Sequence, residues 1–135
     1  MVLLVLIDDR YGMLFKRRRQ SSDSVVTEKI LELTSGKRLW MNSYSRKLFP
    51  ENAPVCIDDD FLRTAGAGDY CFVENCDIKP FVNNAEKIIL FRWNRSYPAD
   101  LLFPKEVLCH DWTVAQSLDF SGNSHEKITM EVYSR

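Results

Sequence analysis

Apolar positions in this chain follow two different periods. The opening run from Met1 to Ile7 is wholly apolar and rich in branched side chains, which is typical of a strand buried on both faces of a sheet. It has no basic lead and meets Asp8 after seven residues, too early for a secretion signal or a membrane span. From Val25 to Thr34 the apolar residues recur at helical spacing, which predicts a helix.

The later elements are shorter and are separated by glycine, proline and turn residues. Apolar runs predict strands at 37–41, 70–73 and 87–93, and two long antiparallel strands at 112–120 and 127–133 joined by the turn 121–123. Short helices are expected at 42–49, 58–65 and 77–81. This order predicts a three-layer α/β fold with a mostly parallel central sheet, helices on both of its faces and an antiparallel C-terminal hairpin.

The composition indicates one domain over residues 1–135, because 135 residues with 45% apolar side chains fill one core but not two. The 18 basic and 19 acidic residues give a net charge of -1, which favours neither nucleic acid nor a membrane surface as a partner. Four cysteines form no C-x-x-C pair and two histidines lie at no metal-ligand spacing, so we expect reduced thiols, a cytoplasmic protein and no metal. Cys109 adjoins His110, but neighbours in sequence seldom face each other, so we interpret it as an ordinary thiol.

One basic run departs from this near-neutral charge balance. The four residues 16–19 are all basic and precede the first predicted helix. Cations in such a row can hold a phosphorylated or polyanionic small molecule. The candidate residues for this ligand are Met13, Phe15, Lys16, Arg17 and Arg18. We interpret the run as a solvated loop in preference to a ligand site, and it lacks the interleaved aromatic residues that would favour nucleic acid.

Two predicted helices begin at polar residues that have more than one interpretation. Asp23 follows two serines, where a carboxylate can cap free N–H groups and complement the helix dipole. Ser43 and Ser45 begin the second helix, and with Arg46 they can bind a phosphate or act as ordinary caps. Tyr44 can stack on a planar ring, although aromatic residues more often belong to the core. His125 is expected to cap or fill the corner of the terminal hairpin.

The last third of the chain carries the clearest resemblance to a known family. The stretches from Tyr97 to Pro104, at Trp112 and from Asn123 to Tyr133 keep the order and spacing of segments that close the dihydrofolate reductase fold. Earlier segments follow the same order. Residues 8–13 resemble the start of that family's mobile active-site loop, and residues 21–23 resemble the segment with its pterin-binding acid. Residues 39–45 and 72–87 resemble its two cofactor loops.

This resemblance implies an NADPH-dependent reductase of a pterin-like or other planar heterocycle. Asp23 would anchor the substrate and help to deliver the proton that accompanies hydride transfer. The residues that would hold NADPH are Ser43, Tyr44, Ser45, Arg46, Glu74 and Asn75.

Several positions depart from the family's pattern. Val73-Glu74-Asn75 stands where the family has a glycine pair, and Glu74 adds negative charge near the expected pyrophosphate. Leu101 follows Asp100 where the family has a hydroxyl residue that supports the catalytic acid. The chain also resembles a shortened member between Phe49 and Asp58, and an edge left by a missing strand would be a natural place for a homodimer.

We therefore expect a ligand-binding or regulatory derivative of this fold with a weakened nicotinamide-cofactor site, acting on a small or anionic molecule. The alternatives are the NADPH-dependent reductase itself, and RNA or polyanion binding through Lys16 to Arg19, which would depend strongly on salt. The opening segment also resembles short uncharacterised bacterial proteins sometimes labelled ribonuclease Z. That activity requires a histidine-rich two-metal cluster, which two histidines cannot supply.

Overall fold

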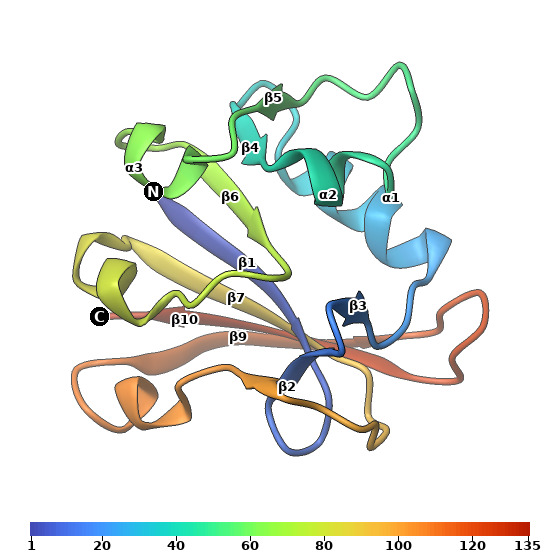
Figure 1. The fold of residues 1–135 in the computed structure, drawn as a ribbon. Helices are drawn as coiled ribbons and strands as arrows, with labels where there is room; N and C mark the ends of the chain where they lie inside the picture. The colour runs from blue at the N-terminus through green and yellow to red at the C-terminus, as the bar shows by residue number, and fades with distance from the viewer.

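A seven-stranded sheet runs through the centre of the molecule in the order β5-β4-β6-β1-β7-β10-β9 (Figure 1). The computed structural model describes every residue from Met1 to Arg135. The sheet strands are β1 (Val2–Ile7), β4 (Leu39–Met41), β5 (Cys56–Ile57), β6 (Tyr70–Val73), β7 (Lys87–Arg92), β9 (Thr113–Phe120) and β10 (Ile128–Ser134). β1 is parallel to β6 and β7, and β4 is parallel to β5 and β6, whereas β10 is antiparallel to β7 and β9. The predicted sheet and its terminal hairpin are confirmed.

The side chains of β1 alternate between two apolar cores, one on each face of the sheet. Leu3, Val5 and Ile7 belong to one cluster, and Leu4 and Leu6 belong to the other. The second face is covered by the helix α1 (Ser24–Leu33). The first is covered by the helix α3 (Phe61–Thr64) and the 3-10 helices η1 (Lys79–Asn84) and η2 (Lys105–Cys109). Helices on both faces were predicted, and the structure confirms them.

Two α-helices are shorter than the sequence pattern indicated. The helix expected at 42–49 is α2 (Ser43–Arg46), because the Arg46 guanidinium donates hydrogen bonds to the carbonyl groups of residues 49–51 and holds the chain in a loop. The helix expected at 58–65 is reduced to α3, since the Asp58 carboxylate accepts a hydrogen bond from the N–H of Asp60 in a turn before it. The segment between Phe49 and Asp58, where we expected the chain to be shortened, contains only the two-residue edge strand β5.

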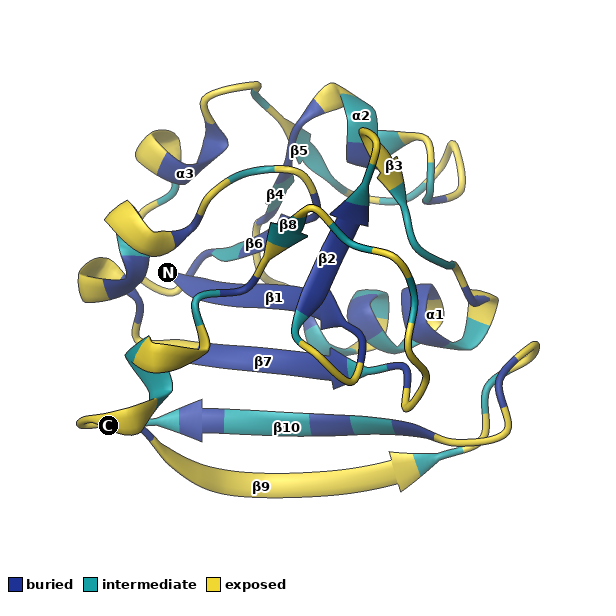
Figure 2. Cartoon of the chain, turned by 60° about the horizontal axis from the view of Figure 1, so that its bottom comes forward, coloured by how far each residue is buried: buried dark blue, intermediate teal, exposed yellow.

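A second sheet was not predicted. It consists of β2 (Gly12–Phe15), β3 (Arg18–Arg19) and β8 (Leu101–Leu102) in the order β3-β2-β8. Figure 2 shows β2 crossing in front of the central sheet. The basic run that we interpreted as a loop is therefore the turn and second strand of a hairpin, which we call the basic hairpin (residues 12–19).

The two edges of the central sheet differ in length and exposure. β5 closes one edge with two residues, whereas β9 closes the other with eight residues that are nearly all exposed (Figure 2). None of the helices has the length and apolar character needed to cross a membrane.

Candidate functional site

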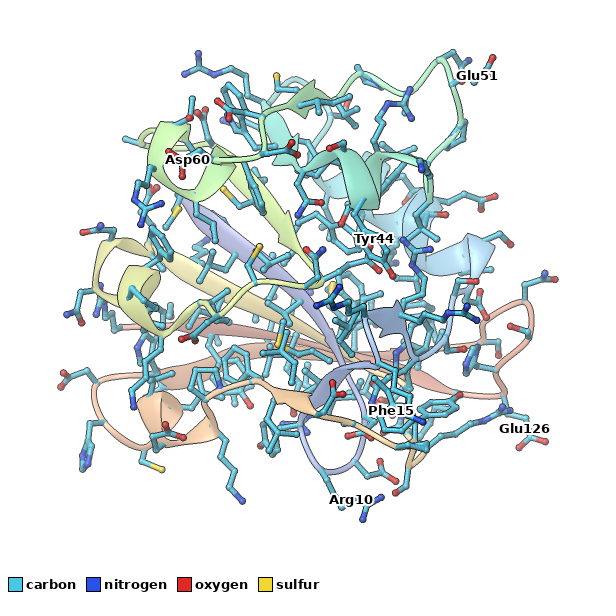
Figure 3. The ribbon with its side chains drawn as sticks, in the orientation of Figure 1. Arg10, Phe15, Tyr44, Glu51, Asp60 and Glu126 are labelled. Atoms are coloured by element: carbon cyan, nitrogen blue, oxygen red, sulfur yellow. The ribbon has the colours of Figure 1, made fainter.

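The parallel strands β1, β4, β6 and β7 end at one edge of the sheet, where polar residues follow three of them. Asp8 follows β1, Asn42 follows β4 and Glu74 follows β6. Ligands of open α/β sheets bind at this carboxyl edge. The basic hairpin, α2 and the start of α1 lie beside this edge (Figure 1). Figure 3 labels Phe15 on the hairpin and Tyr44 on α2.

Glu74 is the centre of a polar cluster at this edge. Its side chain is 3% exposed and accepts two parallel hydrogen bonds of 2.9 Å from the Nε and an Nη atom of Arg19. Its Oε1 also accepts a 2.8 Å hydrogen bond from the Ser45 hydroxyl. Hydrogen bonding to Glu74 raises the pKa of Arg19, so the guanidinium keeps its positive charge. The guanidinium lies over the Tyr44 ring, and the Tyr44 hydroxyl accepts a hydrogen bond from the N–H of Arg19.

The other predicted cofactor residues are also engaged within the protein. Asn75 accepts a 2.8 Å hydrogen bond from the Asn42 amide. Ser43 donates through both its hydroxyl and its N–H to Asp59. Arg46 binds the carbonyl groups of the loop after α2. The structure thus gathers Tyr44, Ser45 and Glu74 around Arg19, while Ser43 and Arg46 bind elsewhere.

Asp23 is buried between the start of α1 and the connection from β9 to β10. Its side chain is 0% exposed and accepts hydrogen bonds from five donors, namely the N–H groups of Val25, Asn123 and Ser124, the Ser124 hydroxyl and the His125 ring. Burial opposes the charge of the carboxylate, but these bonds outweigh it and hold the pKa of Asp23 far below its usual value. The predicted N-cap is confirmed, because Asp23 accepts from Val25 at 3.0 Å.

His125 fills the corner beside Asp23, as expected, and its further contacts could not be read from the sequence. Its Nε2 atom lies 3.0 Å from the Ser21 hydroxyl and 3.3 Å from the Tyr97 hydroxyl. Its ring stacks on Trp93 with the centroids 4.5 Å apart. These partners are separated by up to 104 positions in the chain, so no local pattern connects them.

The basic hairpin turns through Lys16 and Arg17, which have φ values of 48° and 64°. Two consecutive residues with positive φ form the turn that suits a two-residue hairpin, but asparagine and glycine normally occupy it because other side chains are strained there. The backbone N–H of Lys16 donates to Asp100, which fixes the turn. Lys16, Arg17 and Arg18 are exposed, and none of them makes a salt bridge. The chain therefore holds three unneutralised cations on a strained turn.

A cavity of about 480 Å³ lies against this hairpin, within the usual size of a small-molecule site. We call it the basic pocket. Its lining residues are Phe15, Lys16, Arg18, Arg19, Gln20, Tyr97 and Pro98. The Gln20 amide donates to Asp8 and to the carbonyl of Pro98, while its Oε1 atom is buried and has no hydrogen-bond partner. The pocket thus combines cations and two aromatic rings. Of the residues predicted for an anionic ligand, Phe15, Lys16 and Arg18 line it, Arg17 is at the tip of the turn, and Met13 is buried in the core.

The comparisons with known proteins define the fold. No protein-family model matches the sequence, and no curated protein matches it significantly. Among solved structures, the chain is similar to the dihydrofolate reductase from Enterococcus faecalis complexed with NADP(H) and RAB-propyl, with a TM-score of 0.72. The alignment covers 99% of this chain and 95% of that chain at 10% sequence identity. The chain has a dihydrofolate reductase-like fold. At this level of identity the likeness extends to the fold alone.

The residues at the expected cofactor site do not fit a dinucleotide phosphate. The anionic Glu74 carboxylate occupies the end of β6, and both Arg19 and Ser45 are already bound to it. The hollow lined by Glu74, Arg19 and Trp93 measures only about 10 Å³. A phosphate would therefore meet a fixed negative charge at the position where the cofactor was expected.

The ribonuclease Z resemblance finds no support. The structure contains no group of three or more His, Cys, Asp or Glu side chains that could hold a metal ion. All four cysteines are free, and burial raises the pKa of Cys71 to about 12. Cys109 is exposed on η2.

Proposed function

We propose that this protein is a ligand-binding derivative of the dihydrofolate reductase-like fold, and that it binds a small anion carrying a planar ring in the basic pocket. The observation that carries the proposal is the set of unneutralised cations around a cavity of about 480 Å³. Among the cations that line it, Lys16 and Arg18 have no carboxylate partner, so an anionic ligand would supply their counter-charge.

The aromatic part of the ligand is argued from Phe15 and Tyr97, which line the pocket beside the cations. A planar ring can stack on either of them. Together these groups favour a heterocyclic anion over a simple inorganic one.

The strain of the turn supports the same proposal. Residues in sparsely populated backbone conformations persist where the surrounding structure fixes them, and they cluster at ligand-binding sites. Here the two residues with positive φ are Lys16, which lines the pocket, and Arg17, at the tip of the same turn. A hairpin needed only for folding would be more stable with asparagine and glycine in these positions.

The NADPH-dependent reductase with Asp23 as substrate anchor is the alternative. It requires an acceptor on Asp23 that is free for the substrate, and five donors already bind that carboxylate. It also requires Glu74 to release Arg19 before a pyrophosphate can approach. Both requirements count against it. Loss of NADPH absorbance upon addition of dihydrofolate would support it nevertheless.

Isothermal titration calorimetry with ATP tests the proposal, because ATP carries both a planar ring and several negative charges. We expect saturable binding that weakens as salt is raised, since ionic screening reduces exposed charge interactions. The double substitution Lys16→Gln with Arg18→Gln should abolish it, whereas Lys37→Gln, at an exposed lysine far along the chain from the pocket residues, should not. Adenosine, which has the ring without the charge, is the ligand control. Equal binding of adenosine and ATP, or an unaffected double variant, would contradict the proposal.

A further inference from the structure

Ser21, His125 and Asp23 form a hydrogen-bonded chain beside the basic pocket. The Ser21 Oγ lies 3.0 Å from His125 Nε2, and His125 Nδ1 lies 2.9 Å from Asp23 Oδ2. A serine bound to one ring nitrogen of a histidine whose other nitrogen is bound to a buried carboxylate is the geometry of an activated nucleophile. Such sites recur on unrelated folds and are recognised by this geometry, not by the order of their residues.

The network also fixes the roles of the two ring nitrogens. Asp23 is ionised and accepts from Nδ1, so in the neutral ring the hydrogen-bond network assigns the proton to Nδ1 and leaves the Nε2 lone pair directed at Ser21. The stacked Trp93 ring holds the imidazole in this orientation. Anchoring the β9–β10 connection to α1 does not require this arrangement, because Asp23 already binds the N–H groups of Asn123 and Ser124.

Among these three residues, Ser21 is the one that solvent can reach. The side chains of Asp23 and His125 are 0% and 2% exposed, whereas Ser21 is partly exposed. Ser21 adjoins Arg19 and Gln20, which line both the basic pocket and the hollow of about 10 Å³ that Ser21 itself lines. A hollow of this size holds no more than about one water-sized group, so the site favours the shortest acyl groups, with the rest of the ester outside the hollow.

We propose that Ser21 is the nucleophile of a second activity, the transfer or hydrolysis of short acyl groups from aromatic esters that carry a negative charge. The preference for a charged ester rests on the proposed binding function, but the reaction at Ser21 does not. Asp23 acts as a positioning residue for His125 in this scheme.

The reaction follows from the geometry. Ser21 Oγ attacks the ester carbonyl carbon while His125 Nε2 takes its proton, and the carbonyl oxygen becomes an oxyanion. The Tyr97 hydroxyl lies 3.3 Å from the same nitrogen, and we assign it as the donor to that oxyanion. The carbon–oxygen bond of the ester then breaks, and the leaving phenoxide takes the proton from Nε2. Water attacks the acyl-serine, gives one proton to Nε2, and releases the carboxylic acid as Ser21 recovers its proton.

Two acetyl esters test this proposal: p-nitrophenyl acetate, which is neutral, and acetylsalicylate, which has a ring and a carboxylate. We expect turnover of both, with acetylated Ser21 identified by peptide mass spectrometry after rapid quenching. Ser21→Ala should lower both rates by at least about 100-fold, the size of a general-base contribution. Ser22→Ala is the matched control at the neighbouring exposed serine and should retain the activity. His125→Gln should reproduce the loss, with thermal unfolding measured alongside to show that the variant is folded.

The two proposals fail in different ways. Ser21→Ala that hydrolyses both esters at the wild-type rate would overturn the nucleophile, whatever the pocket binds. Lys16→Gln with Arg18→Gln should lower kcat/KM about tenfold for acetylsalicylate only, which corresponds to the loss of about 1.4 kcal/mol of binding. Equal loss for both esters would overturn the preference for a charged substrate, and it would leave the reaction at Ser21 supported.

Discussion

Asp23→Asn should destabilise the protein because it removes a charge that five donors surround. Asparagine has nearly the same shape and also caps helices well, so the helix start itself should tolerate it. Its Oδ1 can still accept from Val25 and Asn123. Its NH₂ group, however, replaces the oxygen that accepts from Ser124 and from Nδ1 of His125. The N–H of Ser124 and Nδ1–H of His125 would then face the NH₂ group, which is also a donor.

The magnitude follows from the number of donors left without an acceptor. A buried donor without a partner costs about 1–3 kcal/mol, and the Ser124 hydroxyl can rotate to offer its own lone pair, so we expect a loss of about 3 kcal/mol. For a chain of this length, unfolding temperature falls by about 3–4 °C per kcal/mol, which gives about 10 °C.

The pH dependence provides a second measurement of the same charge. The folded-state pKa of Asp23 is lowered, so its stabilisation is fully present above the unfolded-state pKa of about 3.9 and is lost as pH falls below it. Wild-type protein should therefore lose stability between about pH 5 and pH 2, and the variant should lose less over that range. Urea denaturation at several pH values measures both effects.

Asp59→Asn is the matched control for this substitution. Asp59 also accepts hydrogen bonds from a serine hydroxyl and an N–H, but it is exposed. The unfolding temperature of Asp59→Asn should remain close to that of the wild-type protein. If Asp23→Asn unfolds at the wild-type temperature and with the wild-type dependence on pH, the five-donor arrangement does not stabilise the protein and the reasoning is refuted.

Three further predictions concern the surroundings of the basic pocket. Gly12→Ala should cost about 1–3 kcal/mol, because a Cβ at this position would lie 2.6 Å from both the Ala99 Cβ and the Gln20 Nε2; an unchanged urea midpoint would contradict this close packing. Glu74→Gln should cost about 2–4 kcal/mol, since Arg19 loses its carboxylate partner, and a cost no larger than that of the exposed Glu28→Gln would argue against a stabilising pair. Replacing Lys16 by asparagine and Arg17 by glycine should raise stability by about 1 kcal/mol while weakening ATP binding; a loss of stability in thermal unfolding would refute the strain at this turn.

The fold could be predicted because its main elements have strong local patterns. β1 is a continuous apolar run, and α1 combines helical spacing with a cap at Asp23. The basic hairpin could not be predicted for the opposite reason. Its turn residues, Lys16 and Arg17, have positive φ and lack the asparagine and glycine that signal such a turn.

The site could be predicted only in part, since its key contacts join distant residues. The sequence indicated that Glu74 would oppose a phosphate, but its partner Arg19 lies 55 positions away and no pattern links the two. Asp23 was predicted to be either a cap or a substrate anchor, and its bond to His125, 102 positions away, becomes visible only in the folded chain. Its role as a substrate anchor stays a prediction, as does the homodimer.

The most direct test of the account is a titration with NADPH, followed by tryptophan fluorescence, in the wild-type protein and in the Lys16→Gln/Arg18→Gln variant. Trp93 lines the hollow beside Arg19 and Gln20, so a ligand in the adjoining basic pocket should alter its emission. The account predicts weak, salt-sensitive quenching in the wild type that disappears in the variant, because the basic pocket and not the cofactor groove receives the anion. Tight, saturable quenching that persists unchanged in the variant would contradict it and would show that the groove at Glu74 still binds the cofactor.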